Sequence, residues 1–231
     1  MRASGEEEKE THMSDLKLVI GNKRYSSWSL RPWLLMTHFG MPFEEIPVAL
    51  DTPEFKPTVL KFSPSGKVPC LVDGDLHVHE TLAIIEYLAE IFPEHDVWPR
   101  DRAARALARA LSNEMHAGFM GLRSACPMNL RRSFAFKDRG AAAAKDVTRI
   151  IEAWRDARGR HGAAGPFLFG AFSAADAMFA PVVTRLDGYS WPLDGDIRAY
   201  MDEILALPAF RAWKAGADAE TQIVAADEVE E

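Results

Sequence analysis

Residues 65–88 of this 231-residue chain read SGKVPCLVDGDLHVHETLAIIEYL. The apolar run at 68–72 predicts a strand, the Asp-Gly-Asp sequence at 73–75 predicts a tight turn, and residues 76–79 predict a returning strand. From Glu80 onward the apolar residues recur at helical spacing, which indicates a helix. The stretch therefore predicts a hairpin that leads directly into a helix.

Two features of this stretch favour the binding of a short extended peptide. Pro69 opens a strand but has no N–H group to give to the ladder, so the neighbouring backbone of Val68 is expected to be free for a ligand. Glu80 and Thr81 lie at a helix N-terminus, where unpaired N–H groups attract an anion. We expect the peptide's carboxylate at Thr81 and its ammonium group at Glu80. The alternative is a plain hairpin and amphipathic helix without a ligand.

The sequence Gly-Lys-Val-Pro at 66–69, followed by Glu-Thr-x-Ala-Ile-x-x-Tyr-Leu at 80–88, resembles the glutathione site of the cytosolic glutathione S-transferases. The resemblance extends over roughly residues 17–220. It implies a cis peptide bond before Pro69 and pairing of the preceding backbone with the cysteinyl part of glutathione. It also implies that the acid and the hydroxyl at the start of the helix bind the γ-glutamyl end. Thr81 stands where the family more often has serine, and it keeps the hydroxyl.

The resemblance also implies a lysine partner for the glycine carboxylate of glutathione. Related classes use a lysine directly before the residue whose backbone pairs with the peptide, and Lys67 occupies that position. Lys56, on the preceding irregular segment, is an alternative. An exposed, solvated lysine without a ligand is the competing interpretation of both.

Activation of the glutathione thiol needs a hydroxyl donor or a helix N-terminus directed at the sulfur, because the thiolate is the nucleophile. The sequence Ser-Ser-Trp-Ser-Leu-Arg at 26–31 resembles the active-site loop of the zeta class, which suggests a bacterial, serine-type enzyme. The resemblance implies Ser26 as the catalytic serine, with Ser27 beside it and Tyr25 as a further candidate. Trp28 stands where the zeta class has a cysteine, which weighs against isomerase chemistry. Loop hydrogen bonding and capping are the alternative roles of the serines.

In the family's fold, the second substrate binds between the two domains. The residues expected to line that pocket are Tyr25, Trp28, Met115, His116, Phe119 and Arg123. Arg123, Arg131 or Arg132 is a candidate for binding an acidic co-substrate. Cys126, close to these arginines in sequence, is a candidate redox thiol with a lowered pKa. Core packing or a solvated basic edge is the alternative for each of these residues.

The order of the predicted elements indicates an α/β domain followed by an all-α domain. Residues 16–92 predict the order βαβαββα of a thioredoxin-like domain, and residues 93–100 a linker. Residues 101–222 predict an all-helical domain. Residues 1–15 are expected to be a disordered tail, and residues 223–231 a solvated acidic tail.

Several local signals set the expected helix boundaries. Ser29 is a plausible N-cap for the first helix, with Pro32 in its first turn. The second domain is expected to have long helices at 101–125 and 134–158. Further on, Ser173-Ala-Ala-Asp176 matches a capping box in front of a buried helix.

Composition argues against several functional classes. The formal net charge of −7 argues against a nucleic-acid partner, which requires a basic face. No stretch reaches a membrane-spanning length, and the first residues lack the apolar segment of a signal peptide. Cys70 and Cys126 are the only cysteines, which fits a reducing cytoplasm without a disulfide framework. The seven histidines lack the spaced partners of a metal site.

We therefore expect a cytosolic glutathione S-transferase in which the glutathione thiol attacks a small hydrophobic or acidic electrophile. Glutathione is the expected co-substrate, no permanently bound cofactor is expected, and the resemblance implies a homodimer. Two alternatives stay open. One is a glutathione-dependent cis–trans isomerase of the maleylacetoacetate type, and the other is a protein that binds glutathione or a hydrophobic ligand without turnover.

Overall fold

Four strands form one mixed sheet in the order β2-β1-β3-β4. β1 pairs in parallel with β2 and antiparallel with β3, and β3 and β4 form the expected hairpin. Gly74 turns this hairpin at φ +56°, a left-handed conformation that glycine adopts without steric cost. The strands are β1 (Lys17–Ile20), β2 (Glu44–Pro47), β3 (Cys70–Asp73) and β4 (Leu76–His79).

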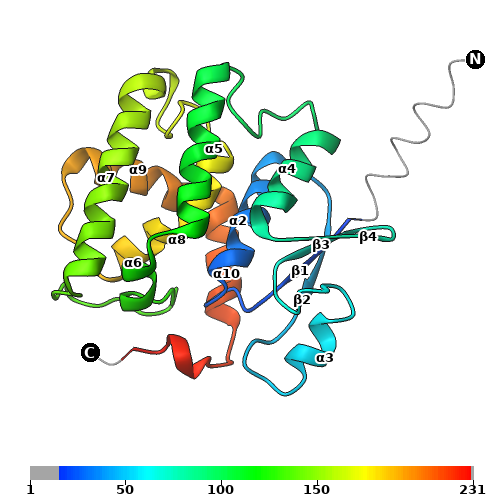
Figure 1. Cartoon of the computed structure of the whole chain (residues 1–231). Helices are drawn as coiled ribbons and strands as arrows, with labels where there is room; N and C mark the ends of the chain where they lie inside the picture. The colour runs from blue at the N-terminus through cyan, green and yellow to red at the C-terminus, as the bar shows by residue number, and fades with distance from the viewer. Residues whose placement is uncertain (1–15, 230–231) are drawn as a thin grey trace, which may run out of the picture.

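The computed structural model describes residues 16–229, and its first domain has the predicted order βαβαββα. Its helices are α2 (Ser27–Phe39), α3 (Phe55–Val59) and α4 (Thr81–Ile91) (Figure 1). α2 connects the two parallel strands and ends at Gly40, as expected. The prediction that Ser29 caps α2 was wrong. The N-cap is Ser26, three residues earlier, and the Ser29 hydroxyl lies inside the helix, where it accepts a hydrogen bond from the N–H of Gly21, at 3.1 Å.

The second domain is all-helical, as predicted. The helices α5 and α9 pack against α8, which is buried along nearly its whole length. The helical elements are α5 (Arg102–Ala117), α6 (Met120–Ala125), α7 (Ala141–His161), the short 3-10 helix η1 (Gly162–Ala164), α8 (Ala174–Gly188), α9 (Gly195–Ala206), α10 (Pro208–Ala219) and the 3-10 helix η2 (Ala225–Asp227).

The single helix expected at 101–125 is divided into α5 and α6. A Cβ atom on Gly118 would lie 2.8 Å from the carbonyl oxygen of Glu114, so the chain turns where only glycine fits. Phe119 follows with φ +58° and a buried side chain. The helix therefore breaks here, although the apolar residues of the segment keep helical spacing. Gly118 permits the turn because it has no side chain, and burial of Phe119 stabilises it.

The helix expected at 134–158 begins instead at Ala141. Phe134 is held by tertiary contacts, since its N–H donates to Gly188 and its ring stacks on Tyr189 with a centroid separation of 4.8 Å. Residues 134–140 therefore run as an irregular segment along the end of α8. The α7 helix then extends three residues past the predicted end, to His161.

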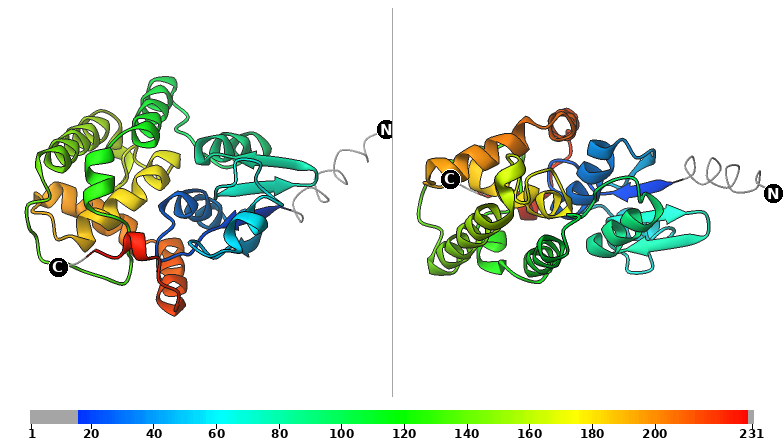
Figure 2. Two further views of the ribbon diagram at one scale, coloured as in Figure 1. Left: turned by 60° about the horizontal axis from the view of Figure 1, so that its bottom comes forward. Right: turned by 90° about the horizontal axis from the view of Figure 1, so that it is seen from above.

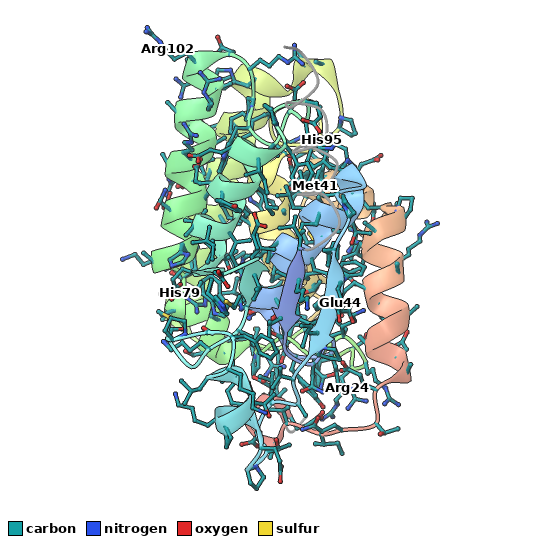
Figure 3. The ribbon with its side chains drawn as sticks, turned by 90° about the vertical axis from the view of Figure 1, so that its right-hand side faces the viewer. Arg24, Met41, Glu44, His79, His95 and Arg102 are labelled. Carbon is teal, nitrogen blue, oxygen red and sulfur yellow. The ribbon has the colours of Figure 1, made fainter. Side chains whose placement is uncertain are left out.

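The two domains meet where α2 packs against α8 (Figure 2). Arg31 on α2 crosses this junction and donates from Nε to the carbonyl of Met178 on α8, at 2.9 Å. Figure 3 shows α10 beside the strand that carries Glu44, with α5, which begins at Arg102, on the opposite side. Elements of both domains thus flank the junction. Within residues 16–229, no helix combines the length and apolar character needed to cross a membrane.

Candidate functional site

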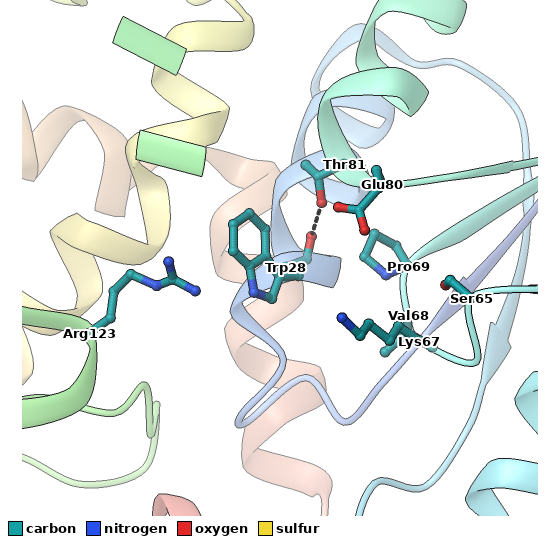
Figure 4. A pocket seen from close by; sticks show the side chains of 8 residues that line it. All are labelled: Trp28, Ser65, Lys67, Val68, Pro69, Glu80, Thr81 and Arg123. Atoms are coloured by element: carbon teal, nitrogen blue, oxygen red, sulfur yellow. Dashed lines mark hydrogen bonds between the residues drawn. The ribbon is translucent and has the colours of Figure 1, made fainter. Parts of the chain in front are cut away.

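A cavity of about 230 Å³ lies where the first domain faces α6 (Figure 4). It brings together five residues predicted to bind glutathione: Lys67, Val68, Pro69, Glu80 and Thr81. Trp28, Ser65 and Arg123 complete the lining. Lys56, the alternative lysine, is not among the lining residues, because its ammonium group lies against Gly66.

Val68 lies beyond the end of a β-ladder, on the wall of this cavity. The peptide bond between Val68 and Pro69 is cis, as the resemblance implied. β3 pairs only from Cys70 onward, so the predicted strand start at residue 68 was two residues too early. An extended peptide can therefore pair with the Val68 backbone without displacing another strand.

Glu80 immediately precedes α4 and has φ +72°. A non-glycine residue rarely adopts this conformation, and such residues cluster at functional sites. Its Oε2 lies 3.5 Å from Nε2 of His116, and the His116 ring packs on Trp28 with centroids 5.0 Å apart. About half of the Glu80 side chain is exposed, so its carboxylate is accessible to an ammonium group.

Thr81 links α4 to α2 through a hydrogen bond that depends on Pro32. Because α2 starts at Ser27, Pro32 lies in its second turn rather than in the first, and it has no N–H for the carbonyl of Trp28. Thr81 Oγ1 donates to that carbonyl at 3.2 Å (Figure 4). The threonine hydroxyl therefore holds the start of α2 against the start of α4.

We expect Thr81→Val to lower the free energy of unfolding by about 1–2 kcal/mol, because the Trp28 carbonyl then loses its partner. Thr81→Ser keeps the hydroxyl and should stay within about 0.5 kcal/mol of the unmodified protein. Urea denaturation measures both. Thr52→Val, which removes an exposed hydroxyl, is the matched control. Equal stabilities of the valine and serine variants at position 81 would contradict this role.

A second cavity, of about 340 Å³, adjoins the first and shares Trp28, Lys67, Val68 and Arg123 with it. The remaining lining residues come from the loop before α2 and the first residue of α2, from the α3 region, from the segment after α6, from α8 and from η2. They are Tyr25, Ser26, Ser27, Leu50, Phe55, Pro127, Met128, Arg185 and Asp227. The two cavities therefore meet at the N-terminus of α2.

The two candidate serines differ in their hydrogen bonds. The Ser26 hydroxyl donates to the Ser29 hydroxyl at 2.7 Å, and the Ser26 side chain is buried. Ser27 is the first residue of α2, is partly exposed, and its hydroxyl has no hydrogen-bond partner within residues 16–229. The proton of Ser26 is thus already engaged, whereas that of Ser27 can be donated into the cavity.

The Tyr25 hydroxyl is not available to donate a hydrogen bond to a thiol, because it is engaged by the segment that follows α10. Its hydroxyl donates to Glu228 at 2.6 Å and accepts from Arg24 at 2.7 Å. Burial, followed by the hydrogen bond to Glu228, raises the pKa of Tyr25. The prediction of a solvated acidic tail was therefore wrong for Glu228, which also accepts hydrogen bonds from Asn129 and Arg132.

The predicted second-substrate residues divide into two groups. Trp28 and Arg123 line both cavities, Tyr25 lines the second, and His116 contacts Trp28. Met115 and Phe119 are buried in the hydrophobic core and line neither cavity.

Cys126 is buried, and burial raises its pKa. That direction contradicts the lowered pKa expected of a redox thiol. Sequence reasoning missed Arg185 and Asp227. Arg185 is part of a buried core helix, and Asp227 belongs to a segment whose charge suggested only solvation.

Three arginines gather near Trp28, one from each of α2, α6 and α8. The guanidinium groups of Arg31 and Arg123 lie over the Trp28 ring, 4.2 and 4.9 Å from its centroid. Burial, followed by the charges of Arg185 and Arg123, lowers the pKa of Arg31 well below its usual range. Burial and the charge of Arg123 likewise lower the pKa of Arg185 to about 10. The region around Trp28, where these three arginines meet, is therefore positively charged.

No group of three or more His, Cys, Asp or Glu side chains within residues 16–229 is arranged to hold a metal ion. At the junction, hydroxyl groups, guanidinium groups and the N-termini of α2 and α4 can donate hydrogen bonds to an anion.

Comparison with known proteins gives matches in both domains. The family model described as "Glutathione S-transferase, N-terminal domain" matches residues 25–91, and "Glutathione S-transferase, C-terminal domain" matches residues 135–213. A zeta-class glutathione S-transferase from Euphorbia esula is 33% identical over 114 residues, 49% of this chain and 51% of that protein. A probable maleylacetoacetate isomerase from Caenorhabditis elegans is 36% identical over 111 residues, 48% of this chain and 51% of that protein. The chain thus spans about half the length of these curated relatives.

Solved structures match over more of the chain. A Burkholderia glutathione transferase homologue with bound glutathione has a TM-score of 0.68 and 24% identity, covering 90% of this chain and 100% of that chain. Glutathione transferase F2 from Populus trichocarpa has a TM-score of 0.69 and 17% identity, covering 89% and 100%. At these identities the likeness concerns the fold, and the predicted fold class is confirmed.

Proposed function

This chain belongs to the glutathione S-transferase family, and we therefore propose that it binds glutathione in the first cavity and activates its thiol for attack on an electrophile in the second. The observation that carries the proposal is the junction of the two cavities at the N-terminus of α2, where they share four lining residues. A thiol bound at this junction reaches the second cavity directly.

In the proposed complex, glutathione lies extended along the first cavity. The Val68 backbone pairs with its cysteinyl unit, and Lys67 binds its glycine carboxylate. The γ-glutamyl carboxylate accepts hydrogen bonds from the N-terminus of α4 at Thr81. Glu80 binds the ammonium group of the same unit. The position of all four residues on one cavity wall supports this assignment.

The sulfur would then lie at the N-terminus of α2, where the helix dipole favours a negative charge. The Ser27 hydroxyl donates a hydrogen bond to the sulfur and stabilises the thiolate, and the thiol proton passes to solvent. The sulfur lone pair forms a bond to the electrophilic carbon, and the leaving group departs with the electron pair of the broken bond. The unengaged hydroxyl of Ser27 supports its choice over Ser26.

The pKa of bound glutathione tests the proposal. With saturating glutathione, an ultraviolet pH titration of thiolate absorbance should give a thiol pKa of about 7 or below, compared with about 8.5 for an ordinary thiol. Glutathione analysed alone and S-methylglutathione bound to the protein provide the baselines. Binding without a lowered pKa would overturn the transferase proposal and favour a protein that binds glutathione without turnover.

A glutathione-dependent isomerase is a second candidate, favoured by the similarity to a probable maleylacetoacetate isomerase. Trp28, where the zeta class has cysteine, weighs against it. Mass analysis of the product separates the two, because an isomerase releases glutathione unchanged and a transferase leaves it attached.

We also propose that the protein is a cytoplasmic homodimer, as the resemblance implied. Both cysteines are unpaired and buried, which fits a reducing compartment. Light scattering during size-exclusion chromatography tests the dimer. A mass corresponding to one 25.7 kDa chain would contradict it.

A further inference from the structure

Within residues 16–229, the three arginines near Trp28 carry positive charge that is not paired with a carboxylate at salt-bridge distance. Arg31 donates to the carbonyls of Met178 and Ser27, and Arg123 donates to the carbonyl of Gly118. In the described part of the chain, the almost fully buried Arg185 guanidinium likewise donates only to backbone carbonyls, those of Cys126 and Pro181. None of the three forms a salt bridge within residues 16–229. A buried charge without a counter-ion is costly, so its retention points to an anion that binds there.

One carboxylate of the chain already lies on the same cavity wall. Asp227 and Arg185 both line the second cavity and attract each other electrostatically, without a direct salt bridge between them in the described part of the chain. Burial raises the pKa of Asp227, whereas the charge of Arg185 opposes that rise. Asp227 therefore acts on Arg185 electrostatically, from beyond the distance of a salt bridge.

Glu228 holds Asp227 in this position. The Glu228 carboxylate accepts hydrogen bonds from Tyr25, Asn129 and Arg132, at 2.6, 2.9 and 3.4 Å. The segment after α10 is thus fixed at the cavity by the neighbouring acid Glu228. Asp227 lines the cavity within electrostatic reach of Arg185, and its carboxylate makes none of these anchoring hydrogen bonds. An incoming anion can compete with Asp227 while the anchor stays in place.

We propose that the second substrate is an organic carboxylate whose anionic group binds Arg123 and Arg185 and takes over the electrostatic role of Asp227. This inference rests on the proposed function and specifies its substrate class. Arginine suits such a group because its planar guanidinium can donate two parallel hydrogen bonds to a carboxylate. Trp28 supplies a flat apolar face beside the arginines for the rest of the molecule. The cations also offset repulsion between the substrate carboxylate and the glutathione thiolate.

A matched pair of electrophiles tests this. Chloronitrobenzoate and chloronitrobenzamide differ at one substituent, a carboxylate in the first and a neutral amide in the second. We expect kcat/KM with glutathione to be at least about tenfold higher for the benzoate. Arg123→Met should reduce the benzoate-to-benzamide ratio by about tenfold, mainly through KM of the benzoate. Asp227→Asn should raise the same ratio severalfold.

The controls are Arg211→Met and Asp218→Asn, which change the same charges on α10 outside both cavities. Equal turnover of the two electrophiles, or a ratio unchanged by Arg123→Met, would overturn the inference. A higher pKa of bound glutathione in Arg123→Met, with equal losses for both electrophiles, would also overturn it and assign the cation to the thiolate.

Failure of the proposed function is distinguishable from failure of this inference. If neither electrophile is turned over, the transferase proposal fails. Calorimetry without glutathione still tests the anion site, because chloronitrobenzoate should bind more tightly than the benzamide and more weakly to Arg123→Met. Equal binding of the two compounds would overturn the inference independently of catalysis.

Discussion

Ser27→Ala is expected to lower kcat by about 100-fold, because it removes the hydroxyl proposed to stabilise the thiolate in a partly water-excluded site. The pKa of bound glutathione should rise in parallel, toward its value in solution. Affinity for glutathione should change little, since the contacts at Val68 and Thr81 are untouched. Steady-state kinetics and the ultraviolet titration measure these effects together.

Ser26→Ala is the matched control for this experiment. The Ser26 hydroxyl is paired with Ser29, so its loss should lower kcat by less than about tenfold. The resemblance to the zeta class placed the catalytic serine on Ser26, and the two variants decide between the assignments. A large loss for Ser26→Ala combined with a small loss for Ser27→Ala would reverse ours.

Asp176→Ala is expected to lower the free energy of unfolding by roughly 3 kcal/mol or more. The fully buried carboxylate accepts hydrogen bonds from the N–H groups of Leu168 and Ser173 and from the hydroxyls of Ser173 and Tyr200. Alanine would leave these donors buried without a partner. Urea denaturation measures the loss, and the exposed Asp218→Ala, which breaks only a surface ion pair, should cost less than about 1 kcal/mol.

The same carboxyl gives a pH signature. Burial raises the pKa of Asp176 to about 6, above the value of about 3.9 in an unfolded chain. The folded state therefore binds the proton more tightly, so this group's contribution to stability is complete below about pH 4 and is lost as the pH rises through about 6. Asp176→Asn removes this titration. An unchanged pH slope between these values would contradict the raised pKa.

The first cavity, which we propose binds glutathione, was largely predictable because its sequence signals are local. Pro69 marks the strand end, and Glu80 with Thr81 marks the following helix start. These residues are brought close by a hairpin of adjacent strands, which needs no knowledge of distant packing. The capping box of Ser173 with Asp176 was predicted for the same reason and is confirmed.

The second cavity was less predictable because distant segments form it. Arg185 reads as part of a buried helix, and only the fold brings its guanidinium to Trp28 and Arg123. The break at Gly118 depends on burial of Phe119, which helical periodicity does not reveal. Similarly, the charge of Glu228 suggests solvation until its partners on other segments are known.

Asp227, which contributes to the wall of the second cavity, lies outside both hydrophobic clusters of the protein. A change in the charge of Asp227 therefore carries a small penalty in folding stability, whereas changes in α8 disturb the most deeply buried helix among residues 16–229. Substrate preference is thus the trait that mutation can alter most freely here. Related chains with the same core could diverge in the compounds they accept through this short segment alone.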